Sequence, residues 1–168
     1  MNEPQRLFFV QAQSDIAVFD LLQTQADIPV CHSLHYLQMA TELLGKAYAW
    51  KHGRPDKPHT HRAFVRFLKD LRTNRLAQAQ LGYEGRNENW LHVIRKSIRL
   101  AEAIEDLAPA LQDGPNPEYP WPSKENKVPT TAPVEHTFAL WVELQETAAG
   151  RQFLHLTKRL FATAGAFL

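Results

Sequence analysis

The chain has 168 residues, and its 19 Lys and Arg residues nearly balance its 18 Asp and Glu residues, for a formal net charge of +1. A chain of this length fits a single domain with a sizeable core. The balance excludes a strong overall positive field that attracts nucleic acid from all sides, so any contact with a polyanion has to be local.

Cysteine content and hydropathy indicate the cellular compartment. The single cysteine, Cys31, excludes an intramolecular disulfide. The first residues, MNEPQRLFFV, lack the basic start and apolar run of a secretory signal. No apolar stretch approaches the roughly 20 residues needed to cross a bilayer. We therefore expect a cytoplasmic protein without membrane contacts.

Apolar residues in the first half of the chain recur every three or four positions, as is typical of amphipathic helices. The spacing predicts helices over residues 9–22 and 31–51. After the glycine and prolines of KHGRPDKPHT, Thr60 is the expected cap of a short third helix that ends near Leu71. A further helical turn is predicted over residues 75–81.

The next predicted helix covers residues 85–111. Its polar, outward face is expected to carry Arg95, Lys96, Arg99, Glu102, Glu105 and Asp106. Seven of the eleven prolines lie between positions 109 and 133. Because proline lacks a backbone donor, this segment is predicted to be an extended strap rather than an element of secondary structure. Residues 138–168 again show helical spacing, with Gly150 as the expected kink or junction.

The pattern contains no strand alternation and no internal repeat. The predicted fold class is therefore all-α, a single-domain bundle of about five helices. The core is expected over residues 9–112, followed by the proline-rich strap over 113–134 and a C-terminal helical segment over 135–168.

The segment CHSLHYLQMATELLGKAYAWKHGRPDKPHTHRAFVRFLKDL combines a helix ending in Glu-x-x-x-Lys-Ala with a loop, a histidine and a short apolar helix. The residues that supply this pattern are Glu42, Lys46 and Ala47, then His59 or His61, then Phe64, Leu68 and Leu71. On these residues the chain resembles the HEPN domain (higher eukaryotes and prokaryotes nucleotide-binding) over roughly residues 9–112. The resemblance implies a HEPN-like helical bundle.

Many HEPN domains are metal-independent ribonucleases whose signature is an arginine, usually followed by a polar residue, and a histidine four to six intervening residues later. Arg86, Asn87 and His92 in the stretch GRNENWLH match this signature with five intervening residues. The resemblance implies that Arg86 and His92 are catalytic, with Asn87 in support, and that no metal or other cofactor is needed. It also implies a homodimer in which two such pairs face one cleft.

The chemistry of RNA cleavage explains this choice of residues. One group must take the 2′-hydroxyl proton, one must protonate the leaving oxygen, and one must neutralise the charge between them. Histidine suits the proton transfers, and the arginine fork grips phosphate oxygens. In one continuous helix Arg86 and His92 would lie about 120° and about 9 Å apart. They can converge only if Asn87 or Asn89 is the N-cap and Arg86 lies on the incoming loop.

Basic residues recur every three or four positions on the third predicted helix and its extension. They are Arg62, Arg66, Lys69, Arg72 and Arg75. One interpretation is a solvated helix face. The other is the phosphate-contacting wall of an RNA cleft, because such contacts position a polyanion without reading its bases.

Three further groups of residues suggest alternative sites. Arg151 and His155 share one helical face, which needs no function to explain it. A metal site would draw on Cys31, His32, His35, His59 and His61, although the chain has no CxxC or HExxH motif and a structural role explains them as well. Tyr119 and Trp121 in NPEYPWP either stack on a nucleobase or pin the strap to the bundle.

The preferred hypothesis is a metal-independent endoribonuclease of the toxin or defence type. The alternative is a HEPN-like module without catalysis that binds nucleotide or RNA, or that pairs with a nucleotidyltransferase as an antitoxin or assembly element. The expected partners are accordingly RNA, a second copy of the chain, and a nucleotidyltransferase of a toxin–antitoxin pair.

Overall fold

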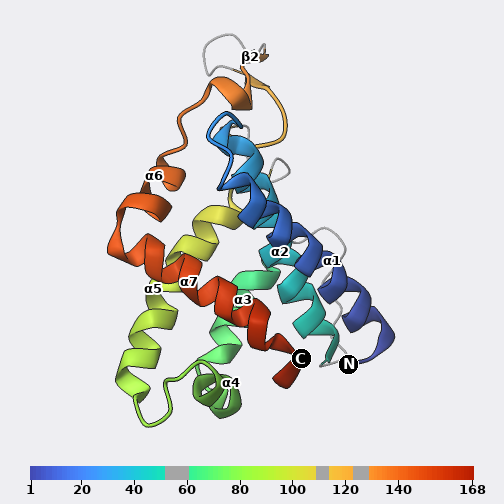
Figure 1. Cartoon of the computed structure of the whole chain (residues 1–168), viewed down its shortest axis with the longest axis vertical. Helices are drawn as coiled ribbons and strands as arrows, with labels where there is room; N and C mark the ends of the chain where they lie inside the picture. Colours follow the sequence, from blue (N-terminus) through green and yellow to red (C-terminus); the bar gives the residue numbers. More distant parts are fainter. Residues whose placement is uncertain (52–60, 109–113, 123–128) are drawn as a thin grey trace.

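A computed structural model describes residues 1–51, 61–108, 114–122 and 129–168 of the chain (Figure 1). The helices in these residues are α1 (Glu3–Leu22), α2 (Val30–Lys51), α3 (Ala63–Leu71), α4 (Arg75–Gln80), α5 (Asn87–Glu105), α6 (Ala139–Glu146) and α7 (Ala148–Thr163). The short strands are β1 (Trp121–Pro122) and β2 (Pro129–Thr131), and two 3-10 turns are η2 (Pro133–Glu135) and η3 (Ala164–Ala166). Across these ranges, no helix is both long and apolar enough to span a membrane.

The prediction of a helical bundle is confirmed, and the number of about five helices is wrong. The described residues hold seven α-helices. The difference arises because α4 is a separate helix, and because the C-terminal segment divides into α6 and α7.

α1 and α2 lie side by side and run in opposite directions along one flank of the molecule (Figure 1). α1 begins at Glu3 rather than at residue 9, because Asn2 and Gln5 form a capping box. The Gln5 N–H donates to the Asn2 side chain (3.0 Å), and the Asn2 N–H donates to the Gln5 side chain (2.9 Å). These bonds satisfy backbone donors at the start of the helix.

α3 and α5 pack on α2, and α7 adds Phe153 and Leu160 to the same core. Phe64, Phe67 and Leu68 of α3 are buried against it. α3 approaches α2 closely because Gly45 has no side chain: a Cβ at this position would clash with the backbone of Ala63 and Phe64. The close approach brings the start of α3 directly onto the middle of α2.

The C-terminal segment breaks at Thr147 rather than at Gly150. Thr147 ends α6 and is also the N-cap of α7, where its hydroxyl accepts a hydrogen bond from the Gly150 N–H (2.9 Å). Gly150 has a different role from the predicted kink. A Cβ there would clash with the backbone of Glu143 and Leu144, so glycine lets α6 and α7 meet.

The proline-rich strap contains a small hairpin, so the prediction that it lacks secondary structure is wrong. β1 and β2 pair antiparallel, with Trp121 opposite Thr131. The Trp121 side chain is buried, and its ring meets those of His136 and Phe138 at centroid distances of 5.1 and 6.5 Å. Trp121 therefore pins the strap, whereas Tyr119 is 61% exposed and does not.

Candidate functional site

A tight turn before α5 places Arg86 at the start of that helix. Gly82 and Gly85 have φ angles of +74° and +70°, a left-handed conformation that favours glycine. The Arg86 N–H donates to the Tyr83 carbonyl (2.9 Å), and the Arg86 carbonyl accepts from the Trp90 N–H (3.0 Å). Arg86 is therefore the N-cap residue, although its side chain makes no capping bond.

Asn87 is the first residue of α5 and Asn89 lies within it, so neither is the N-cap. The turn closed by the Arg86 N–H starts the helix before both of them. The condition under which Arg86 and His92 of one chain can converge is therefore not met. The side chains of Arg86, Asn87 and His92 are exposed. Among the described residues, Arg86 and His92 make no hydrogen bond or ion pair, with each other or with any other side chain.

A basic groove lies where the end of α3, the start of α4 and the first turns of α5 meet. It has a volume of about 540 Å³ and is lined by Lys69, Arg72, Thr73, Arg75, Asn87 and Leu91. A smaller hollow of about 90 Å³ continues it along α5, lined by Arg72, Leu91, Arg95 and Ile98. Because Arg72 and Leu91 line both, the two depressions form one basic surface.

Of the predicted catalytic residues, Asn87 is the one that lines this groove. Arg86 immediately precedes Asn87 in the chain. His92 lies three positions before Arg95 on α5, a spacing that places two helical side chains next to each other. The groove and the Arg-Asn-His signature are thus neighbours. Arg95 was assigned only to an outer helix face from the sequence, because its partner surface on α3 is distant in the chain.

The stripe of basic residues on α3 is not uniform. Arg62 lies 2.5 Å from Asp106 and 3.9 Å from Glu105. Lys69 is 3.8 Å from Glu102, and both side chains are about half exposed, so this pair holds the lysine weakly. Arg72 has no carboxylate partner among the described residues. The stripe is therefore neutralised at its start and open to an anion at its end.

The tryptophan of the GRNENWLH stretch fixes the two walls of the groove. Trp90 is fully buried, and its indole N–H donates to the carbonyl of Leu71, the last residue of α3 (3.2 Å). The neighbours of these two residues, Arg72 and Leu91, line the groove. A bond inside the core therefore sets the distance between the cations of α3 and those of α5.

The residues that carry the HEPN-like pattern form a buried polar cluster at the other end of α3. Glu42 is 5% exposed and contacts two nitrogen-bearing side chains: Lys46 Nζ lies 2.5 Å from one oxygen, and His61 Nδ1 lies 2.7 Å from the other. Of the two histidines that fit the pattern, His61 has this contact, and His59 lies outside the described residues. The cluster joins α2 to the segment that leads into α3.

Glu105 belongs to the same buried end, which corrects its predicted place on the outward face of α5. It is 2% exposed, and its Oε1 accepts from the backbone N–H groups of Phe64 (2.9 Å) and Val65 (3.1 Å). Glu105 thus caps α3, whereas the expected cap, Thr60, lies outside the described residues. Burial raises the pKa of Glu105 to about 7, although the two N–H donors and Arg62 oppose the shift.

The alternative metal and Arg/His sites find structural explanations. Cys31 is buried, which raises the pKa of its thiol, and His35 lies 3.4 Å from Glu118 in the strap. His32 is exposed. Within the part of the chain that the structure describes, no three His, Cys, Asp or Glu side chains are grouped to hold a metal ion.

Arg151 caps the end of α6 rather than forming a site with His155. Its Nη1 donates to the carbonyls of Gln145 (3.2 Å) and Glu146 (2.9 Å). His155 is exposed on α7.

Comparison of this chain with protein-family models, with curated proteins and with solved structures found no match. The features of the molecule that bear on function are therefore the basic groove and the residues beside it.

Proposed function

We propose that this protein binds RNA in the basic groove and cleaves it there without a metal ion, as a HEPN-like endoribonuclease. The observation that carries the proposal is the groove with its adjoining hollow, where cations of α3, α4 and α5 meet and where Asn87 forms part of the lining. One guanidinium group can bind two oxygens of the same phosphate at once, so arginine is suited to contacts with the RNA backbone. The near-neutral net charge confines this attraction to one surface.

In the proposed reaction the 2′-oxygen bonds to the adjacent phosphorus while the bond from phosphorus to the 5′-oxygen breaks. The products are a 2′,3′-cyclic phosphate and a 5′-hydroxyl. His92 takes or gives a proton, and Arg86 neutralises charge on the phosphoryl oxygens. Each chain has one His92, and two proton transfers are needed. A homodimer would supply the second histidine from the other copy.

The test is cleavage of single-stranded RNA in the presence of EDTA. We expect the wild type to cut, and His92→Ala and Arg86→Ala to lose about 100-fold or more in rate, the usual effect of removing a general acid–base group. Both side chains are exposed, so the variants should fold normally. Matched controls are His155→Ala on α7 and Arg6→Ala on α1, which are also exposed. Unchanged cleavage in both test variants would contradict the assignment.

The second candidate is RNA or nucleotide binding without cleavage, either alone or together with a nucleotidyltransferase. It is favoured by the absence of any bond between Arg86 and His92 among the described residues of one chain. In this case the wild type and all four variants would leave RNA intact. Binding would still weaken with rising salt, because phosphate contacts release counterions.

A further inference from the structure

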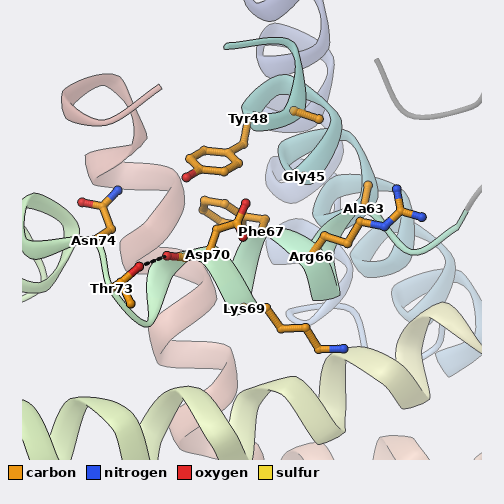
Figure 2. Close-up of a pocket in the computed structure, with 10 residues that line it drawn as sticks. Gly45, Tyr48, Ala63, Arg66, Phe67, Lys69, Asp70, Thr73 and Asn74 are labelled. Carbon is orange, nitrogen blue, oxygen red and sulfur yellow. Dashed lines mark hydrogen bonds between the residues drawn. The ribbon is translucent and has the colours of Figure 1, made fainter. Parts of the chain in front are cut away.

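A larger depression joins the basic groove across α3. It has a volume of about 800 Å³ and lies between the C-terminal part of α2, α3 and the turn before α4 (Figure 2). Lys69 and Thr73 line both this depression and the groove. A chain of phosphates bound along the groove therefore passes the mouth of the depression, which we call the Tyr48 pocket.

The floor of the Tyr48 pocket is aromatic. The rings of Tyr48 and Phe67 lie 4.9 Å apart with a 53° tilt (Figure 2). Tyr48 is 8% exposed and Phe67 is 1% exposed, so a ligand would lie against the edge of this floor rather than stack on a free ring. Such a floor favours a flat, partly apolar group and gives little discrimination among similar ones.

Polar groups surround the floor and differ from one side to the other. Figure 2 shows Thr73 and Asn74 on one side of the aromatic pair, Arg66 on the other, and Lys69 toward α5. Asp70 also lines the pocket, and Figure 2 shows its side chain beside Phe67. Burial raises the pKa of Tyr48, and the negative charge of Asp70 adds to the rise. The pocket thus combines a carboxylate acceptor with cations at its rim.

We propose that the Tyr48 pocket takes one unpaired nucleobase of a single-stranded RNA whose phosphates lie over Lys69 and Arg72, with Asp70 accepting a hydrogen bond from the exocyclic amine of the base. The inference rests on the proposed binding of RNA. The volume is within the range of small-molecule sites and accommodates a base with its ribose. Adenine, cytosine and guanine carry the amine and uracil does not, so the pocket disfavours uracil.

The bases of duplex RNA cannot enter the Tyr48 pocket. They are stacked and paired, and proteins read sequence in RNA chiefly from bases that are splayed out of single strands. The groove can still hold the phosphates of a duplex, because those contacts do not depend on the bases. The Tyr48 pocket therefore adds affinity for single strands and a preference among bases.

The experiment measures the binding of labelled decamers of cytidine, decamers of uridine, and a ten-base-pair duplex. We expect the wild type to bind the cytidine decamer about tenfold more tightly than either of the others, the usual scale for one good base contact. Ala49→Phe places a ring in the pocket, which Ala49 lines, and should reduce the affinity for the cytidine decamer to that for the duplex. Ala17→Phe, on the exposed face of α1, is the matched control.

Asp70→Ala gives a second readout that does not depend on filling the pocket. It should abolish the preference for cytidine over uridine. It should not weaken binding of the uridine decamer, because the substitution removes a negative charge beside the phosphates.

If the wild type, Ala49→Phe and Asp70→Ala all bound the three RNAs equally well, the proposed binding of a base in the Tyr48 pocket would be wrong. The proposed binding of phosphates in the basic groove would stand. If the wild type bound none of the RNAs at low salt, the proposed function and the pocket would both fall.

Discussion

The two ends of α3 carry similar basic side chains in opposite electrostatic settings. At the start of the helix, Arg62 faces Asp106 and the buried Glu105. At its end, Arg72 lines a groove and has no carboxylate partner among the described residues. The cause is α5, which is acidic where it passes the start of α3 and basic where it passes the end. The spacing of charges along one helix therefore does not reveal which of them can meet a ligand.

The largest effect is expected where α2 and α3 touch at the neutralised end. Gly45→Ala should lower the free energy of unfolding by about 3 kcal/mol or more, because the new Cβ meets backbone that cannot move aside easily. Urea denaturation would measure it. Gly165→Ala is the control, since a Cβ at that position meets nothing within 4 Å. Equal stability of the two variants would show that the helices separate at little cost.

A comparable effect is expected from Glu105, and it depends on pH. Because its pKa in the folded protein is raised from 4.5 to about 7, its contribution to stability is fully present below pH 4.5 and is lost as pH rises through 7. Glu105→Gln keeps an acceptor for the start of α3 without the charge. Between pH 4.5 and pH 8, the free energy of unfolding of the wild type should fall relative to that of Glu105→Gln by up to about 3 kcal/mol.

Urea titrations at several pH values would reveal this fall as a widening difference between the wild type and Glu105→Gln. Parallel pH profiles for the two proteins would contradict the raised pKa. His136→Gln, in the aromatic cluster of the strap, would show whether other titrating groups produce a similar trend.

A smaller effect, on binding, separates the two ends directly. Arg72→Ala should weaken RNA binding about tenfold. It should also reduce the slope of log affinity against log salt concentration by about one, the value for one phosphate contact. Arg62→Ala removes the same charge from the neutralised end, and it should change RNA affinity about twofold or less while lowering stability. Binding titrations at several salt concentrations would measure both. If the two substitutions weakened binding equally, the contrast between the ends would disappear.

The smallest effect on stability is expected from His92. His92→Ala should change the free energy of unfolding by about 0.5 kcal/mol or less, because the side chain is exposed. His61→Ala should cost about 1 to 3 kcal/mol, since it leaves the buried Glu42 with one partner fewer. Thermal or urea denaturation of both variants would test the difference between a histidine that holds the fold and one that is open to a ligand.

The helices could be predicted from sequence because their apolar residues recur at helical spacing, and most ends fall within a few residues of the expected positions. The strap hairpin could not, because its strands are held by the burial of Trp121 against Phe138, a contact between segments that no local pattern records. The junction at Thr147 was missed because Gly150 serves a close approach between helices rather than a bend.

Part of the site was also accessible from sequence. The basic stripe and the stretch around Arg86 are visible in the sequence, but the ion pairs that divide the stripe depend on α5. A signal for Glu105 was present: Ser97 and Ala101 precede it at intervals of four, and these small residues mark the buried side of α5. Glu105 thus occupies the next position on the buried side of α5. The expectation of an outward face rests on its charge alone.

The hydrogen bond from Trp90 to Leu71 has a consequence for how the groove can change. Trp90 does not line the groove but helps to set its width. If the groove binds RNA as proposed, substitutions in the hydrophobic core should therefore alter RNA affinity. Trp90→Phe would remove the hydrogen bond to the Leu71 carbonyl and so loosen the contact between α3 and α5, the two helices that border the groove. A substitution that loosens the packing of α5 against α3 should therefore also change the spacing of the exposed arginines, and with it the anions that they can bind.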